Sequence, residues 1–180
     1  MAMINKAISV SIKQKKEDTL YTVKWEELVN EHMEERQCKS TDFPRPELDN
    51  TLTALGEYIP DMCCIIKDQI RFLEVAGGTF EYTKVGTFLT LGVAISLKNG
   101  KSFDFRSPAT MVNMKMQINE ATTAEERFSA LAAMLHDEIL LYAQGQRAQT
   151  TLGLEGWTAE VIEDEEGGGQ DDCVDEESTE

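Results

Sequence analysis

Hydrophobic and polar positions alternate through the first part of the chain. The apolar positions of this pattern are Ile8, Val10, Ile12, Tyr21, Val23 and Trp25. Alternation with a period of two is typical of strands that bury one face, so residues 4–26 are predicted to form a β-hairpin. Residues 27–41 are highly charged and leave two alternatives open: a short helix, or a loop that leads into a strand near 36–40.

The period changes to three or four residues after Pro46. The apolar residues that carry the new period are Leu48, Leu52, Leu55 and Ile59. This spacing places them on one face of a helix. Pro46 suits the first helical position, where its missing N–H is not needed, and Pro60 predicts the end of the helix.

Residues 70–108 are rich in β-branched and aromatic side chains, which favour strands. The alternating positions are Ile70, Phe72, Val75, Phe80, Tyr82, Phe103 and Phe105. Gly77-Gly78 is interpreted as a turn between the first two strands. The apolar segment 88–97 predicts a third strand, and Asn99-Gly100 is typical of a hairpin turn into a fourth, which ends at Pro108.

A second helix is predicted downstream. Thr122 and Thr123, each followed three residues later by a glutamate, form overlapping capping boxes, and Gly145 marks the end of the helix. Its apolar face comprises Phe128, Leu131, Leu135, Ile139 and Tyr142. The order of elements implies an α+β fold, an antiparallel sheet with two helices packed on one face.

Charge divides the chain into two regions. The net charge is −16, and eleven acidic residues with no Lys or Arg lie from Glu160 onward, so the rest of the chain carries only −5. A segment of this composition buries too little apolar area to offset the entropy of ordering. We therefore predict a globular domain over residues 1–158 and a disordered acidic tail over residues 159–180. Strong acidity disfavours passive binding to nucleic acid or anionic membrane and favours basic partners, or a local basic patch.

The cysteines and apolar segments indicate a cytoplasmic protein without a membrane partner. The four cysteines are Cys38, Cys63, Cys64 and Cys173, and their spacing makes a poor disulfide framework, so a reducing compartment is the simpler interpretation. The N-terminus lacks the apolar core of a signal peptide. The longest apolar stretch is far too short to span a membrane. The sequence leaves the oligomeric state open, a homo-oligomer included.

Catalytic and metal-binding patterns are incomplete. Gly100-Lys101-Ser102 resembles the end of a phosphate-binding loop, but Ile95 replaces the required glycine. His136-Asp137 lacks the further ligands of a phosphohydrolase site. Zinc ligation by His32, Cys38 and the Cys63–Cys64 pair would lack any Cys-x-x-Cys spacing, and the adjacent cysteines are better interpreted as small buried residues. We expect no enzymatic activity, no cofactor and no metal.

Basic residues interleaved with aromatic ones provide the candidate site. Single-strand binding combines cations that contact phosphates with rings that stack on bases. The candidate nucleic-acid-binding residues are Lys24, Trp25, Lys98, Lys101, Phe103 and Arg106. The alternative is that the rings fill the core and the lysines protect edge strands from aggregation.

Three segments resemble small, uncharacterised phage and prophage proteins of replication and recombination regions. They are Pro44-Arg45-Pro46-Glu47-Leu48-Asp49, Gly86-Thr87-Phe88-Leu89-Thr90-Leu91 and the stretch from Tyr142 to Gln149. The acidic tail is similar in composition and position to the tails of phage and bacterial single-stranded DNA-binding proteins, although it ends in Glu176-Glu177-Ser178-Thr179-Glu180 instead of an apolar tip.

These observations favour a non-enzymatic, phage-type accessory protein of DNA replication or recombination. It would bind single-stranded DNA on one sheet face, while the acidic tail modulates occupancy and recruits basic replication or recombination proteins. The alternative is an acidic inhibitor that mimics DNA and occupies a basic groove on a host defence or nucleic-acid enzyme.

Overall fold

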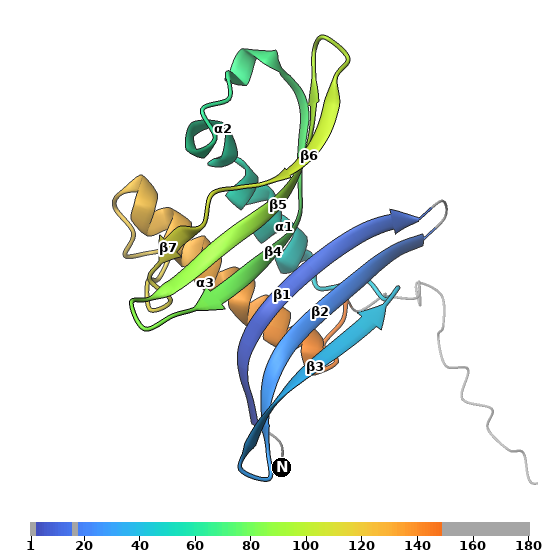
Figure 1. Ribbon diagram of the computed structural model, residues 1–180, viewed down its shortest axis with the longest axis vertical. Helices are drawn as coiled ribbons and strands as arrows, with labels where there is room; N and C mark the ends of the chain where they lie inside the picture. The colour runs from blue at the N-terminus through green and yellow to red at the C-terminus, as the bar shows by residue number, and fades with distance from the viewer. Residues whose placement is uncertain (1–2, 16–17, 149–180) are drawn as a thin grey trace, which may run out of the picture. The chain divides into compact units, whose positions relative to one another are not determined.

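The computed structural model describes residues 3–15 and 18–148. Its elements are β1 (Met3–Lys15), β2 (Asp18–Val29), β3 (His32–Ser40), α1 (Pro46–Gly56), α2 (Ile59–Met62), the 3₁₀ turn η1 (Lys67–Gln69), β4 (Ile70–Tyr82), β5 (Thr87–Leu97), β6 (Ser102–Arg106), β7 (Thr110–Val112) and α3 (Ala124–Ala143). The strands form one seven-stranded antiparallel sheet in the order β3-β2-β1-β4-β5-β6, and β7 pairs with β5 (Figure 1). The predicted α+β class and antiparallel sheet are confirmed.

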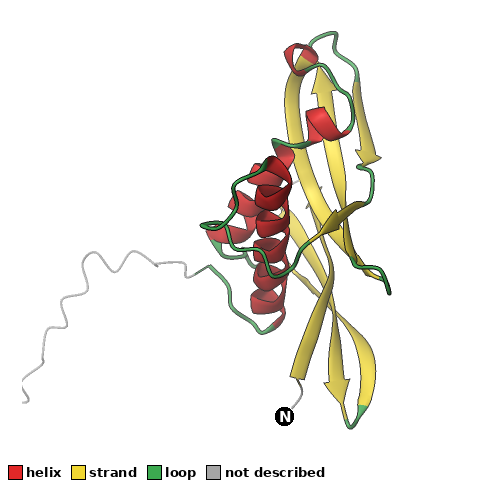
Figure 2. Cartoon of the chain, turned by 90° about the vertical axis from the view of Figure 1, so that its left-hand side faces the viewer, coloured by secondary structure: helices red, strands yellow, loops and turns green. Residues whose placement is uncertain are grey.

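Helices α1 and α3 lie on the same face of the sheet, and the opposite face carries no helix of the described chain (Figure 2). Both predicted helical stripes are confirmed. In the first predicted helix the buried side chains are Leu48, Leu52, Leu55 and Ile59. In the second they are Phe128, Leu135, Ile139 and Tyr142, while Leu131 is half-buried. They pack against alternate residues of the central strands, Val10, Val23, Val75, Leu89, Leu91 and Val93. The sheet therefore has a helix face and an open face.

The charged segment 27–41 forms a strand over most of its length. β2 continues to Val29, and the chain reverses through Asn30 and Glu31, whose φ angles of 47° and 66° both lie in the left-handed region. Two such residues are typical of a tight turn between antiparallel strands. β3 then begins at His32, earlier than the alternative near 36–40. Its alternation is hidden because an edge strand carries charged side chains on both faces.

The predicted turn at Gly77-Gly78 is wrong, because β4 runs through both glycines without a break. Gly77 pairs with Ser11 of β1, and a Cβ atom there would lie 2.2 Å from the carbonyl oxygen of Val10. Its φ of 153° also disfavours any other residue. The glycine is needed for close approach of two strands. β1 and β4 are paired over only three residue pairs, and beyond Ser11 the two strands diverge (Figure 1).

Smaller differences concern the ends of elements. α1 ends at Gly56, and Pro60 lies within the short α2. Cys63 is half-buried and Cys64 is exposed with a φ of 54°, so the expectation of two buried cysteines is wrong for the second. β7 has no counterpart in the predicted elements. The predicted tail 159–180, and the domain boundary before it, lie outside the described residues.

Candidate nucleic-acid interface

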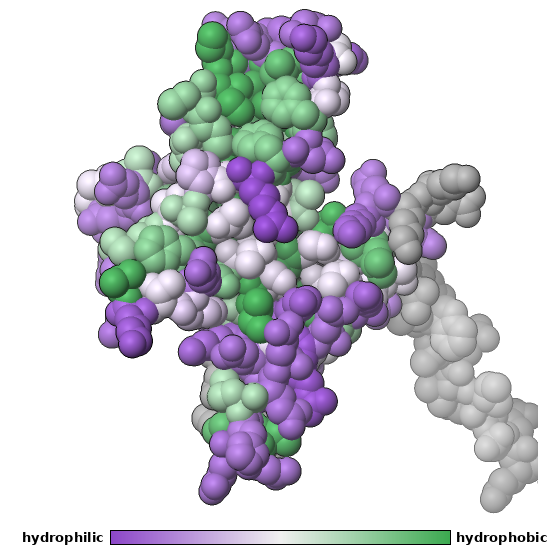
Figure 3. All heavy atoms as spheres, in the orientation of Figure 1, coloured by the Kyte–Doolittle hydropathy of each residue, from purple (hydrophilic) through white to green (hydrophobic). Residues whose placement is uncertain are grey.

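A row of four residues, two of them glycines, crosses the open face of the sheet. Ser11, Gly77, Gly92 and Arg106 pair in register across β1, β4, β5 and β6. The two glycines leave a floor without side chains, and this row lines a groove of about 510 Å³. Figure 3 shows this face, with residues of intermediate hydropathy at its centre, a hydrophobic area above them and hydrophilic side chains mainly below them and at the sides. The backbone of an extended polymeric ligand can therefore approach the sheet closely here.

Basic side chains border this groove on both sides. Lys13 from β1 and Arg106 from β6 line it and are exposed. Among the described residues of the lining, only Asp104 carries a carboxylate, and it is exposed as well. Lys24 also lies on the open face, where its Nζ contacts Glu35 Oε1 at 3.0 Å. Lys13 and Arg106 thus line the groove without an ion pair to any other residue that the structure describes, while Lys24 is already paired with an acid.

The β5–β6 hairpin tip carries a second basic group. Lys98 and Lys101 flank the turn at Gly100, whose φ of 84° confirms the predicted Asn99-Gly100 turn. A cavity of about 450 Å³ next to the tip is lined by Arg71 and Phe72 together with Ser96, Leu97, Gly100 and Ser102. The Phe72 side chain is 54% exposed. The sequence indicated a strand through Phe72, yet only the fold brings Phe72 and Arg71 to a cavity that Gly100, from the turn between the two lysines, also lines.

The structure divides the six candidate residues into three places. Lys24 and Arg106 lie on the open face, and Lys98 and Lys101 lie at the hairpin tip. Trp25 points to the helix face, where it is half-buried against the core. Phe103 is 45% exposed but pairs with the buried Ile95, so it lies on the face opposite Arg106. The rings of Trp25 and Phe103 therefore do not share a surface with the open-face cations.

His136 is a structural residue of α3. Its Nδ1 lies 3.1 Å from Asp137 Oδ1, and its Nε2 accepts a hydrogen bond from the backbone of β1. Both ring nitrogens are occupied by neighbours within the fold. Within residues 3–15 and 18–148, no three His, Cys, Asp or Glu side chains gather in a way that could hold a metal ion.

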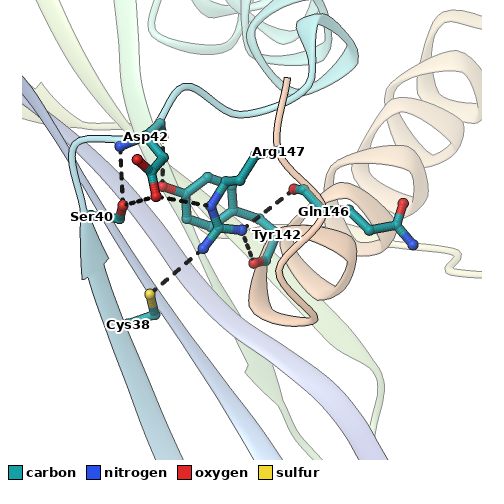
Figure 4. Close-up of polar contacts among 6 residues, drawn as sticks. All are labelled: Cys38, Ser40, Asp42, Tyr142, Gln146 and Arg147. Carbon is teal, nitrogen blue, oxygen red and sulfur yellow. Dashed lines mark hydrogen bonds and ion pairs between the residues drawn. The ribbon is translucent and has the colours of Figure 1, made fainter. Parts of the chain in front are cut away.

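A second polar cluster lies where the chain leaves α3 (Figure 4). The Arg147 guanidinium stacks on the Tyr142 ring at 3.4 Å from its centroid and donates to the Tyr142 carbonyl. It also approaches Cys38 of β3 at 3.8 Å and Asp42 at 3.9 Å. The Tyr142 hydroxyl donates to the Asp42 carbonyl at 2.8 Å. Since these contacts join β3 to the end of α3, the cluster anchors the fold.

In comparisons with known proteins, no family model, curated protein or solved structure matches the chain. The resemblance to phage proteins stays a prediction. In the part of the chain that the structure describes, every helix is too short or too polar to cross a membrane.

Proposed function

We propose that this chain is a non-enzymatic, phage-type accessory protein that binds single-stranded DNA on the open face of its sheet. The observation that carries the proposal is the groove bordered by Lys13 and Arg106 over the side-chain-free row of Gly77 and Gly92. Cations at the two sides of a flat floor suit a phosphate backbone that lies along the sheet.

The hairpin tip extends this surface. Ser96 and Ser102 lie on the same strands as the groove, four residues from Gly92 and Arg106, which corresponds to roughly 13 Å along the sheet. Phe72 supplies the exposed ring on which a base can stack, and Arg71 lines the same cavity as a cation. Lys98 and Lys101 add charge at the turn that contains Gly100, another residue of the lining. Stacking needs unpaired bases, so a single strand fits this surface better than a duplex does.

The acidic tail is opposite in charge to the groove cations Lys13 and Arg106. Its eleven acidic residues repel DNA and compete for the same cations, so it would lower occupancy. The same charge gives basic replication or recombination proteins a segment to bind. The proposed location is the host cytoplasm, where a phage-encoded protein meets replicating DNA.

Fluorescence anisotropy with a labelled oligo-dT tests the proposal, using the full chain and a variant in which the acidic residues of 160–180 are replaced by Gln and Asn. Binding should be measurable at low salt and tighter in the neutralised variant. The logarithm of affinity should fall with the logarithm of salt concentration, with a slope of roughly −0.7 per neutralised phosphate. Absence of single-strand binding by both proteins at low salt would refute it.

A second candidate function is mimicry of DNA by an acidic inhibitor. The β2–β3 hairpin favours it, because a single hairpin carries Glu26, Glu27, Glu31, Glu34 and Glu35. Of these, Glu35 is paired with Lys24, and Glu27 and Glu34 are paired with Arg36. Competition assays distinguish the two functions: a mimic displaces DNA from a basic nuclease without binding the oligonucleotide itself.

A further inference from the structure

The sheet ends in two edge strands of different character (Figure 1). β3 forms one edge and carries charged side chains on both faces, a composition that discourages pairing with another chain. β6 forms the other edge, and among the described strands it pairs with β5 alone. Its charged residues are one acid and one base, Asp104 and Arg106. The β6 edge is therefore the less protected of the two.

Two hydrogen bonds at the ends of β6 show which of its backbone groups face outward. The Ser107 N–H donates to the Leu91 carbonyl at 2.8 Å, and the Lys101 carbonyl accepts from the Leu97 N–H at 2.8 Å. Successive residues of a strand direct their backbone groups to alternate sides, so the odd-numbered residues of β6 face β5. The backbone groups that point away from the sheet are those of Ser102, Asp104 and Arg106.

The side chains of β6 are also available for contact. Asp104 and Arg106 lie on the open face, and neither forms an ion pair with another residue of 3–15 or 18–148. On the helix face, Phe103 is 45% exposed and contacts Phe105, with ring centroids 6.1 Å apart. Outward-facing backbone groups together with exposed aromatic rings are typical of a strand that pairs with another chain.

We propose that two copies of this chain pair through their β6 strands, antiparallel and around a two-fold axis at Phe105. In this register Asp104 lies opposite Arg106 of the second copy, and the symmetry repeats the pair. The two pairs exchange about four backbone hydrogen bonds. An axis at Asp104 would place this carboxylate opposite its own copy, and an axis at Phe103 would place it opposite Ser102. Charge complementarity therefore selects the register centred on Phe105.

The same register brings aromatic rings together on the helix face. The Phe105 side chains of the two copies lie opposite each other in a pair without mutual hydrogen bonds, where side chains approach most closely. Phe103 lies on the diagonal to Phe105 of the second copy, within reach of an aromatic side chain. Removal of these rings from water favours association, while the charges on the open face fix the register.

Sedimentation equilibrium of the full chain, over a wide range of concentration and at moderate salt with a reductant, tests this pairing. A reversible monomer–dimer equilibrium is expected. Asp104→Arg and Arg106→Asp should each weaken it by about tenfold or more, because each places like charges opposite each other at two positions. An equimolar mixture of the two variants should form heterodimers, since every arginine then lies opposite an aspartate.

Glu120→Arg is the matched control, because it makes the same change of charge at an exposed position in the loop before α3 and should not weaken the dimer. Asp104→Pro removes one outward N–H, a change that an edge strand tolerates, and should abolish pairing. Circular dichroism verifies that each variant is folded. A monomer at every concentration, or a dimer that neither charge reversal weakens, would overturn the proposal. The measurement contains no DNA, so its failure leaves single-strand binding untouched.

Discussion

His136 of α3 accepts, through Nε2, a hydrogen bond from the backbone N–H of Ala7 in β1 at 3.3 Å. Ala7 is 0% exposed and lies at a register shift between β1 and β2. Its carbonyl is satisfied by a second side chain, the Tyr82 hydroxyl of β4 at 2.7 Å. Burial, and secondly Glu26, raises the pKa of this phenol, so it stays a donor. Side chains of α3 and β4 thus satisfy an irregular point of β1.

Replacing His136 by Ala should lower the free energy of unfolding by about 1–3 kcal/mol, because the buried Ala7 N–H loses its acceptor. Urea denaturation measures the change. Arg127→Ala is the matched control, since Arg127 is an exposed residue of the same helix, and this substitution should cost no more than about 0.5 kcal/mol. Equal effects of the two substitutions would show that the Ala7 bond contributes nothing.

Gly77→Ala should destabilise the protein by about 3 kcal/mol or more, because the added Cβ meets the Val10 carbonyl at the short β1–β4 seam. Gly92 lies beside Gly77 in the same row, but its Cβ would meet only the Gly77 carbonyl, at 3.9 Å. Gly92→Ala should therefore cost less than about 1 kcal/mol. Thermal unfolding of both variants tests the contrast, and a mild effect at Gly77 would mean that the strands separate easily.

The N-terminal cap of α3 should respond to acid. Glu126 accepts hydrogen bonds from Thr122 and Thr123, at 2.7–3.0 Å, which lower its pKa to about 2. The unfolded-state pKa is about 4.3. The cap's contribution is therefore complete above the unfolded value and is lost as pH falls through the folded one. The stability difference between wild type and Glu126→Gln should shrink from pH 5 to pH 2, as followed by urea titrations. Glu125→Gln, next to the cap, should show no such trend.

Charge reversal on the open face should weaken binding of single-stranded DNA. Lys13→Glu and Arg106→Glu are each expected to reduce affinity by about tenfold at low salt, because each removes a phosphate contact. Phe72→Ala should reduce it through lost stacking. Lys115→Glu, an exposed change in the loop before α3, controls for net charge. Equal losses for Lys115→Glu and Arg106→Glu would indicate a general charge effect in place of a defined groove.

Local patterns in the sequence determined much of the fold. The first hairpin, the stripes of α1 and α3, the turn at Asn99-Gly100 and the Thr123 cap all depend on residues a few positions apart. Spacing of side chains along one strand or helix is sufficient for such features, because the backbone period alone decides which side chains share a face. The sequence also indicated which residue types could contact DNA, although it did not indicate on which surface they would meet.

Tertiary contacts decided the remainder. Whether Gly77 is a turn or a strand residue depends on the Val10 carbonyl, which lies far away in the chain. The face on which Trp25 lies and the meeting of Phe72 with Gly100 at one cavity are equally non-local. In each case the packing of one strand or helix against another decides where the residue lies. The hydrophobic period along a single segment contains no information about the segment that packs against it.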